Sequence, residues 1–188
     1  MTYNNLSTNK NWYYKYLDSN EQKIGKLITN INEVIVKYSE KKGSEADANL
    51  IINNIWLGNQ IAAHDLNFVT SKFIKNVINV SDDVPNKFDF LDYYSCSIKD
   101  SDTCYKNIIN VLEKGAEIIN YSVKNNNKIL VHCKRGHHRS ASIVAFYLMK
   151  YHNMSLIDAI YVIKNSRPTA FRRINCMMQS LINYEINR

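Results

Sequence analysis

The stretch "KILVHCKRGHHRSASIVAFYLMK", residues 128–150, changes its hydrophobic pattern abruptly within one short segment. It opens with a run of apolar residues, which is typical of a buried strand. From Arg139 to about His152, small and apolar residues continue over several turns, which predicts a helix. Cys133 directly follows the apolar run. The segment therefore predicts a strand–loop–helix junction with a cysteine at the start of the loop.

The loop between this strand and this helix has the features of an anion-binding site. Successive backbone amides and the positive end of a helix dipole attract phosphate-type anions. Gly136 lies in mid-loop, where the backbone must turn sharply and approach a ligand closely. Arg139 stands at the helix start, where its planar guanidinium can bind two oxygens of a phosphate or sulfate-type anion. Four more loop side chains are expected around the anion: Lys134, Arg135, His137 and His138.

The same environment acts on the thiol of Cys133. A helix N-terminus and neighbouring cations favour the thiolate form of a cysteine. A thiolate beneath a bound phosphate can attack it in line and form a thiophosphate, which is covalent catalysis. Ser140 can donate a hydrogen bond to the sulfur when it leaves again. An inert buried cysteine is the alternative for an isolated residue, but Gly136 and Arg139 at this spacing argue against it.

Outside this segment, short strand patterns alternate with helical ones along the chain. Strands are predicted at 74–80, 93–98 and 129–132, with a hairpin or pair of short strands at 49–59. Further helices are predicted at 61–73, 106–123, 155–166 and about 173–185. This alternation predicts an α/β fold with a central, mostly parallel sheet flanked by helices on both faces.

The N-terminal part, residues 1–45, is predicted to hold an arm and an amphipathic helix ahead of a domain at 46–188. Apolar residues from Ile24 to Tyr38 follow one helical stripe within 20–42. Gly43 comes after the last of them, as a helix stop should. The stripe is expected to pack on its own domain, and the alternative is a homodimer contact through this helix.

Composition narrows the class of protein and its surroundings. The 188 residues carry a formal net charge of +7, which suits anionic partners, although no block of five like charges occurs. No secretory signal pattern and no run of about 18 apolar residues is visible, so we expect no membrane span and a cytosolic, or cytosolic and nuclear, protein. Four cysteines without a CxxC pair indicate a reducing compartment. Cys96, Cys104 and Cys176 are expected as thiols, and a disulfide of one of them with Cys133 is the alternative.

The sequence argues against two other kinds of site. Adjacent histidines such as His137 and His138 rarely converge on one ion, and no second cluster has zinc spacing, so no metal is expected. Trp56 and the tyrosines are interpreted as core and surface aromatics rather than a platform for stacked bases. Nucleic acid is therefore not expected as a partner.

These motifs resemble the cysteine-dependent protein tyrosine phosphatases and, among them, the dual-specificity subgroup. "VHCKRGHHRSAS" is similar to the signature loop of that family, with His-Cys, two residues, Gly, two residues and Arg-Ser. The resemblance extends over about residues 46–185. Four further segments carry it: "NNIWLGN", "VINVSDDVPN", "SIKDSDT" and "AFYLMKYHNMSLIDAIYVIKNSRP".

The resemblance implies a three-layer phosphatase fold with an extra N-terminal helix, and a role for each loop residue. Cys133 would be the nucleophile and Arg139 the clamp on phosphate and transition state. Ser140 would assist departure of the thiolate, and His132 would orient the loop and support ionisation of the thiol. Backbone amides of residues 134–139 would hold phosphate oxygens. Such an enzyme needs no metal or organic cofactor.

The family also uses an aspartic acid as proton donor to the leaving oxygen. Asp100 and Asp102 are the two candidates in this sequence. Strand register favours Asp100, because Cys96 and Ile98 then occupy the inward positions, and Asp102 would leave Asp100 at a normally apolar position. In the family, the segment between this acid and the catalytic cysteine is usually about two residues shorter than an assignment to Asp100 requires. Its length therefore favours Asp102. We assign the acid to Asp100 and keep Asp102 as the alternative.

Two departures from the family pattern affect the expected substrate. The Pro-Asn pair that often follows "RP" is missing, so Asn175 either replaces its support of the loop from a shifted position or that support is lost. The loop is also more cationic than is common. The implied substrates are phosphotyrosine, phosphoserine and phosphothreonine of proteins. The alternatives are a phosphoinositide or RNA 5′ phosphate, and a catalytically weak phospho-binding module.

Overall fold

The computed structural model describes residues 19–39, 46–98 and 108–188. Its centre is a five-stranded sheet in the order β1-β2-β5-β3-β4. β1 and β2 pair antiparallel, and the other neighbours pair parallel. The strands are β1 Ala48–Ile52, β2 Ile55–Gly58, β3 Ile74–Asn79, β4 Asp92–Ser95 and β5 Lys128–His132. The predicted α/β fold with a mostly parallel sheet is confirmed.

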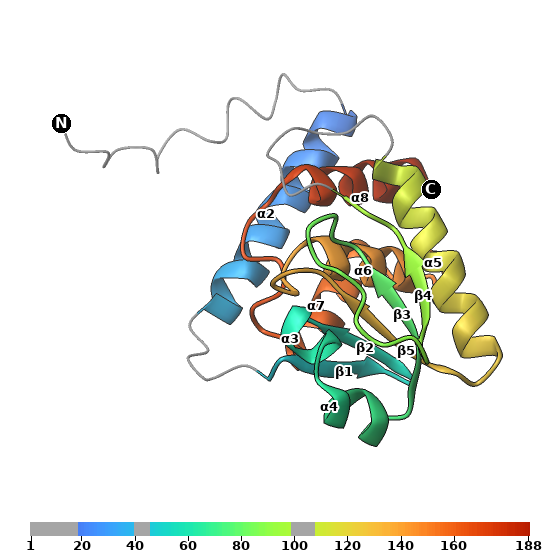
Figure 1. The fold of residues 1–188 in the computed structure, drawn as a ribbon. Helices are drawn as coiled ribbons and strands as arrows, with labels where there is room; N and C mark the ends of the chain where they lie inside the picture. The colour runs from blue at the N-terminus through green and yellow to red at the C-terminus, as the bar shows by residue number, and fades with distance from the viewer. Residues whose placement is uncertain (1–18, 40–45, 99–107) are drawn as a thin grey trace.

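Helices cover both faces of this sheet (Figure 1). The helices are α2 Ser19–Ser39, α3 Gln60–Ala63, α4 Leu66–Ser71, α5 Ile108–Lys124, α6 Arg139–Tyr151, α7 Leu156–Ser166 and α8 Cys176–Asn187. The predicted helix at 61–73 is divided into α3 and α4. His64 ends α3, and Asp65 caps α4, since its carboxylate accepts hydrogen bonds from the amides of Asn67 and Phe68.

The central strand β5 supplies both cores because successive strand residues point to opposite faces. Ile129 and Val131 belong to the larger core, which α5 to α8 cover. Leu130 points the other way, into a smaller core with Val69 of α4 and Val77 of β3. Strands buried on both faces read as continuous apolar runs, which is why "ILV" could be identified as a strand. β5 therefore holds its C-terminal end, and the loop after it, in a fixed position.

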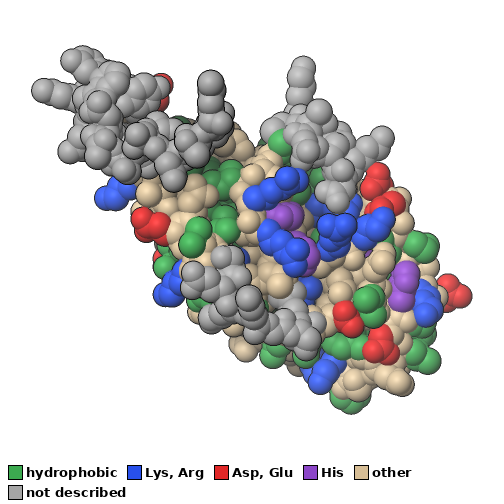
Figure 2. Space-filling model, turned by 90° about the vertical axis from the view of Figure 1, so that its left-hand side faces the viewer, with side chains coloured by type: hydrophobic (Ala, Val, Ile, Leu, Met, Phe, Trp, Pro, Cys, Tyr) green, Lys and Arg blue, Asp and Glu red, His purple; other side chains and the backbone are tan. Residues whose placement is uncertain are grey.

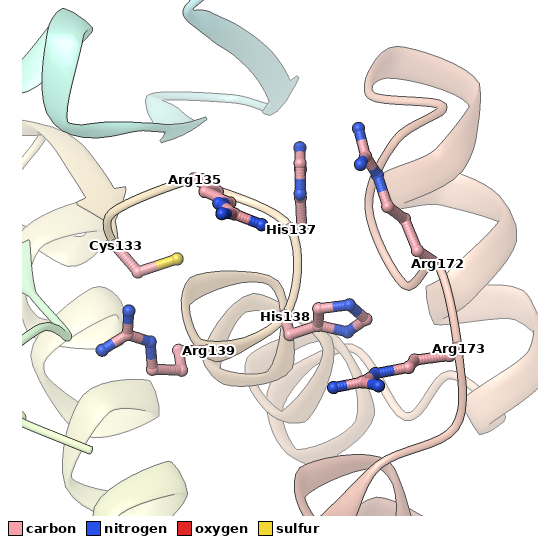
Figure 3. Close-up of a pocket in the computed structure, with 7 residues that line it drawn as sticks. All are labelled: Cys133, Arg135, His137, His138, Arg139, Arg172 and Arg173. Carbon is pink, nitrogen blue, oxygen red and sulfur yellow. The ribbon is translucent and has the colours of Figure 1, made fainter. Parts of the chain in front are cut away.

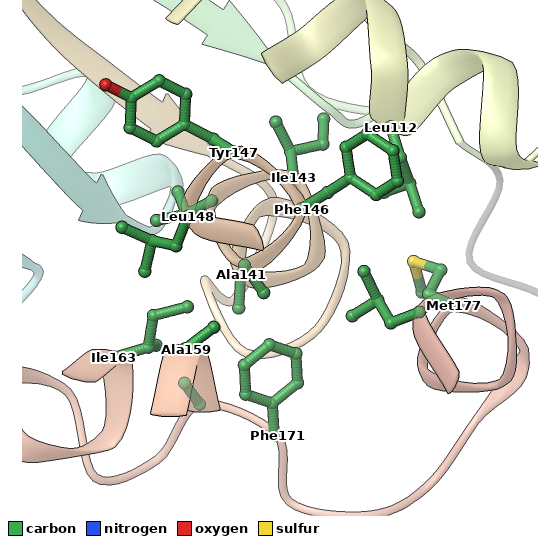
Figure 4. Packing of buried hydrophobic residues seen from close by; sticks show 14 of the residues in the cluster. Leu112, Ala141, Ile143, Phe146, Tyr147, Leu148, Ala159, Ile163, Phe171 and Met177 are labelled. Atoms are coloured by element: carbon green, nitrogen blue, oxygen red, sulfur yellow. The ribbon is translucent and has the colours of Figure 1, made fainter. Parts of the chain in front are cut away.

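Helix α6 is the centre of the larger core (Figure 4). Every residue of α6 from Arg139 to Met149 is buried. Such a helix is buried on all sides, and it packs against α5, α7 and α8. Phe171, which follows α7, is also fully buried in this core. The start of α6 is thus anchored directly behind the loop that joins it to β5.

Helix α2 joins the same core through its apolar stripe. Ile31, Val34, Ile35 and Tyr38 are buried, and α2 contacts α7 and α8 of its own chain. The apolar stripe therefore packs on its own domain, as the sequence predicts. The face that a homodimer through this helix would need is already in use within the chain.

The predicted hairpin is confirmed, and helix α7 begins at a capping serine. β1 and β2 pair around Asn54, whose φ of 62° is the left-handed conformation that Asn tolerates in tight turns. Ser155 caps α7 by accepting a hydrogen bond from the amide of Asp158. Within the described residues, no helix is long and apolar enough to cross a membrane.

Candidate active site

The loop after β5 curls around the sulfur of Cys133, which is 3% exposed. The amide of Gly136 donates to Sγ at 3.2 Å, and the hydroxyl of Ser140 donates to Sγ at 3.3 Å. Gly136 has a φ of 69°, in the left-handed region that glycine adopts without strain. A Cβ there would lie 2.5 Å from the carbonyl oxygen of Gly58 in β2. The glycine thus lets the loop turn inward against the sheet.

Arg139 lies on the other side of the sulfur, at the first turn of α6 (Figure 3). Its side chain is almost fully buried, and Nη1 donates to the carbonyl of Ile98 at 3.0 Å. Two carboxylates face the same nitrogen, Asp82 at 3.7 Å and Asp83 at 4.0 Å. These contacts hold the guanidinium near the position that a phosphate over Cys133 would occupy. Sequence reasoning treated 82–87 only as a loop and missed both carboxylates.

A topological rule could have found these carboxylates. Asp82 and Asp83 follow β3, which is the parallel neighbour of β5. Carboxyl ends of adjacent parallel strands meet at one edge of a sheet, so residues after β3 belong beside residues after β5. The loop after β3 is therefore part of the site.

Lys134 differs from its predicted role. Its amide donates to the hydroxyl of Ser81 at 2.9 Å, and its ammonium group pairs with Asp83 at 2.7 Å. Lys134 is not among the residues that line the pocket around Cys133. The amide of Lys134 thus binds the loop after β3. Its side chain lowers the pKa of Asp83 by hydrogen bonding to that carboxylate, and it does not line the pocket. The prediction that Lys134 binds the anion is corrected accordingly.

The outward side of the loop is held through its carbonyl groups. Arg167 is 1% exposed, and its Nε donates to the carbonyl of Gly136 at 2.9 Å. The amide of Phe171 donates to the carbonyl of His137 at 2.8 Å. Two more carbonyls of the loop accept hydrogen bonds on this side. The carbonyl of Lys134 accepts from the amide of Gln60, and the carbonyl of Arg135 accepts from Nη2 of Arg167. Because the carbonyls are bound on the outside, the amides of the turn can face inward.

Arg167 also ties the loop to β1, since Nη1 donates to the carbonyl of Ala46 and to Oδ1 of Asn49. Asn175, considered from sequence as a support of the loop, instead caps α8 by accepting from the amide of Met178. Arg167 and the amide of Phe171 supply that support. No sequence signal marked either residue, because Arg167 was interpreted only with Pro168 as the end of a helix.

The segment after Arg167 is itself anchored by a buried lysine. Lys164 of α7 is 1% exposed and donates to the carbonyls of Pro168 and Ala170. Its ammonium group lies 5.7 Å from the ring centroid of Tyr38, which belongs to α2. A buried ammonium ion is tolerated when hydrogen bonds and an aromatic face replace water. Helix α2 therefore covers the segment that carries the loop's outer contacts.

The mouth of the site is a cavity of about 340 Å³ that is rich in positive charge. It is lined by Cys133, Arg135, His137, His138, Arg139, Arg172 and Arg173. Figure 2 shows Lys, Arg and His side chains gathered on this face of the molecule. Four of the predicted binding residues line the cavity through their side chains. Arg172 and Arg173 join them from the segment before α8. The sequence favours a solvated turn for these two arginines, with an extension of the basic rim of the pocket as the alternative, and the alternative is what the structure has.

Two histidines of the site are neutral at pH 7. Burial, followed by the charges of Arg172 and Arg167, lowers the pKa of His137 to about 4. Burial also lowers the pKa of His132, the last residue of β5, to about 4. Desolvation disfavours the charged imidazolium in both cases. His132 therefore does not place a positive charge beside the sulfur, and any help to the thiolate must come through orientation and hydrogen bonding.

The remaining site predictions divide by region. Asp100 and Asp102 lie outside the described residues, but Cys96 and Ile98 are both buried, as the strand register behind the Asp100 assignment requires. Cys133 and Cys96 are free thiols, so the alternative disulfide of Cys133 is wrong. Cys176 is disulfide-bonded, which corrects its expectation as a thiol. Within the described residues, no three His, Cys, Asp or Glu side chains gather as metal ligands do.

Known proteins share both the sequence pattern and the fold. A family model for the dual specificity phosphatase catalytic domain matches residues 55–187. Human dual specificity protein phosphatase 21 is 34% identical over 136 residues, which cover 72% of this chain and 70% of that protein. Mouse dual specificity protein phosphatase 18 is 33% identical over 136 residues, covering 72% of this chain and 71% of the relative.

Solved structures give the same answer for the fold. Human DUSP28 superposes with a TM-score of 0.68 at 21% identity, covering 78% of this chain and 97% of its own. PTPMT1 in complex with PI(5)P superposes with a TM-score of 0.61 at 22% identity, and the match covers 76% of this chain and 97% of the PTPMT1 chain. At such identities the likeness concerns the arrangement of helices and strands alone.

Proposed function

The chain belongs to the dual specificity phosphatase family and is a hydrolase of the protein phosphatase class, and we propose that it acts through a cysteinyl-phosphate intermediate on Cys133. The observation that carries this proposal is the pair of donors on Sγ, the amide of Gly136 at 3.2 Å and the hydroxyl of Ser140 at 3.3 Å. Both donors stabilise negative charge on the sulfur, and the thiolate is the nucleophilic form of cysteine.

In the first step, the phosphate monoester binds over Cys133 against the loop amides and the guanidinium of Arg139. The sulfur attacks phosphorus in line, and the bond from phosphorus to the substrate oxygen breaks. That oxygen takes a proton from the general acid, a role that we assign to Asp100 with Asp102 as the alternative. Arg139 stabilises the charge on the equatorial oxygens, because a planar fork matches two of them at once.

In the second step, water attacks phosphorus and the sulfur–phosphorus bond breaks. The carboxylate that lost its proton in the first step accepts one from the water. Inorganic phosphate leaves and Cys133 returns to the thiolate, which is a better leaving group when Ser140 donates to it. The neutral His132 keeps the end of β5 in place beneath the nucleophile. No redox or metal-bound group is needed to balance either step.

The substrates that we propose are phosphotyrosine, phosphoserine and phosphothreonine of proteins. The family membership supports this choice, since the curated relatives that match are dual specificity protein phosphatases by name. The place of action stays a prediction of the sequence, which favours the cytosol with the nucleus as a second location.

Replacing the nucleophile tests the proposal. In Cys133→Ser, kcat for a phosphotyrosine peptide and for p-nitrophenyl phosphate is expected to fall by at least about 10,000-fold. The variant should still bind the phosphopeptide, because the loop amides and Arg139 remain. Cys96→Ser is the matched control, since Cys96 is a free, buried thiol outside the pocket. Undiminished turnover by Cys133→Ser would reject the mechanism.

A further inference from the structure

The cavity around Cys133 contains more positive charge than a single phosphate requires. Arg139 and the inward amides already surround the group over the sulfur. Arg135 and Arg172 line the mouth beyond it, and Arg173 lines it next to His138. Within the described residues, neither Arg135 nor Arg172 forms a salt bridge, whereas Lys134 and Arg139 both face carboxylates. Guanidinium groups in this position are suited to further phosphate groups of the same substrate.

The positions of these cations are fixed relative to the nucleophile. Arg172 directly follows Phe171, whose amide donates to the carbonyl of His137 at 2.8 Å. Arg167 and Lys164 secure the start of the same segment through buried hydrogen bonds. Arg135 belongs to the catalytic loop itself. The two cationic segments are therefore locked to each other, so a ligand with rigidly spaced phosphates can meet both without reordering the backbone.

The chemical character of the lining selects among phosphate-rich ligands. Among the described residues, the lining contains two histidine rings but no aliphatic side chain, no Phe, Tyr or Trp side chain and no carboxylate. A phosphotyrosine ring or a nucleobase gains most from a wall of apolar or large aromatic side chains, and the described residues of the lining offer only the two histidine rings. The volume, about 340 Å³, is in the range of sites that enclose a small molecule. A compact, hydrophilic ring bearing several phosphates fits these features best.

We propose that this site also dephosphorylates a cyclitol polyphosphate, with one phosphate over Cys133 and a second bound by Arg135, Arg172 and Arg173. The cyclitol ring is either free in solution or the headgroup of a lipid, since both present the same chemistry to the pocket. The inference rests on the proposed Cys133 chemistry and adds a second class of substrate to it. The reaction uses the same two steps, with a ring hydroxyl as the protonated leaving group and inorganic phosphate as the final product.

The neutral state of His137 agrees with this assignment. Arg172, Arg167, His138 and Arg135 all face His137, and their charges together with burial keep its pKa at about 4. A phosphate bound among them would offset that repulsion and favour protonation of His137. The ring would then become an additional donor to the ligand.

The test compares phosphate release from four substrates by the full chain. The substrates are p-nitrophenyl phosphate, a peptide phosphorylated on Thr and Tyr, inositol hexakisphosphate, and phosphatidylcholine vesicles with 5% phosphatidylinositol bisphosphate. The variant is Arg172→Ala/Arg173→Ala, in which both side chains are exposed and their loss should not disturb the core. The matched control is Lys75→Ala/Lys124→Ala, which removes two exposed charges away from the pocket.

The expected result is a change in substrate preference. The wild-type chain should hydrolyse at least one of the two cyclitol substrates with a kcat/KM about 10-fold or more above that for p-nitrophenyl phosphate. In the Arg172/Arg173 variant this ratio should fall about 10-fold or more, because charge-assisted contacts to the second phosphate are lost. The lysine control should keep the wild-type ratio. Release from hexakisphosphate alone assigns a free cyclitol, and release from vesicles assigns a lipid headgroup.

Three outcomes would overturn the inference. The first is a wild-type chain that hydrolyses aryl phosphate but releases no phosphate from either cyclitol substrate. The second is an unchanged ratio in the Arg172/Arg173 variant. The third is a larger dependence on these arginines for the doubly phosphorylated peptide, which would assign the second-phosphate contact to proteins. Failure of the proposed function is distinct, because then aryl phosphate and phosphopeptide would show no hydrolysis that depends on Cys133.

Discussion

The loop from Cys133 to Arg139 has two sides that are built in opposite ways. The inner side presents amides, the sulfur and the guanidinium of Arg139 to the cavity. The outer side presents carbonyls, which accept from Gln60, Arg167 and Phe171. One buried arginine serves each side, since Arg139 is 2% exposed and Arg167 is 1% exposed. The same type of side chain thus acts as a ligand clamp in one place and as a backbone support in the other.

The difference between the sides lies in where their residues come from. Every inner group belongs to the one segment that joins β5 to α6, so its spacing is fixed by the local chain. The outer donors belong to α3 and to the segment after α7, about 75 residues before and 30 residues after the loop. An inner residue should therefore affect chemistry most, and an outer residue should affect stability most.

Of the two arginine replacements, Arg139→Lys should have the larger effect on chemistry. Arg139→Lys keeps the positive charge beside Asp82 and Asp83 but loses the fork that binds two phosphate oxygens. We expect kcat for p-nitrophenyl phosphate to fall about 100-fold or more, whereas the free energy of unfolding should fall by only about 1 kcal/mol, since a single carbonyl, that of Ile98, loses its donor. Steady-state kinetics and urea denaturation measure the two quantities. A loss of activity that is explained by unfolding would remove the contrast between the two sides.

The same substitution on the outer side should act mainly on stability. Arg167→Lys loses the bonds from Nε to Gly136 and from Nη2 to Arg135, since an ammonium group cannot reach all of these acceptors. We expect the free energy of unfolding to fall by about 3 kcal/mol, because buried carbonyls lose their donors. The activity of the folded fraction should fall by no more than about 10-fold.

Arg139→Lys serves as the control for this experiment, because the chemical change is identical. If Arg167→Lys left stability unaltered and lowered kcat as strongly as Arg139→Lys, the outer contacts would have no scaffolding role. Denaturation curves of both variants in the same buffer, with kinetics measured well below the transition, separate these outcomes.

The contrast also explains what the sequence could and could not predict. The strand "ILV", the helix after Arg139 and the inner groups Cys133, Gly136 and Ser140 lie in one continuous segment with periodic and motif signals. Their positions follow from local geometry, and the structure agrees with the prediction of the curled loop. The sheet and its helices could be predicted for the same reason, since each strand and helix has its own hydrophobic period.

The outer contacts and the mouth could not be predicted because they depend on tertiary packing. Nothing near Arg167 in the sequence indicates that its side chain reaches β1 and the catalytic loop at once. The sequence alone favours a solvated turn for Arg172 and Arg173. The hydrogen bond from the amide of Phe171 to the carbonyl of His137 brings this turn to the mouth of the site. Lys134 was placed in the pocket on adjacency alone, whereas Asp83 and Ser81 from another loop draw it outward. Hydrogen bonds and one ion pair between distant segments therefore determine these positions.

His137 belongs to both sides of the loop, and its titration should give the smallest of the predicted effects. Its carbonyl accepts from Phe171 on the outside, while its ring lines the cavity with a pKa lowered to about 4. A bound dianion raises that pKa, so protons and anion bind cooperatively. The affinity for sulfate should therefore rise as pH falls below the pKa of the bound state, and level off below about 4.

Sulfate is the appropriate probe because it remains a dianion over this range, and the Cys133→Ser background removes the reactive thiol from the site. Between pH 7 and pH 4.5 we expect the His137 contribution to be about 3- to 10-fold in Kd. Calorimetry of Cys133→Ser with and without His137→Gln isolates it, since the two proteins differ only at residue 137. Identical pH profiles would mean that the ring does not face the bound anion, and that His137 contributes to the loop only through its carbonyl on the outer side.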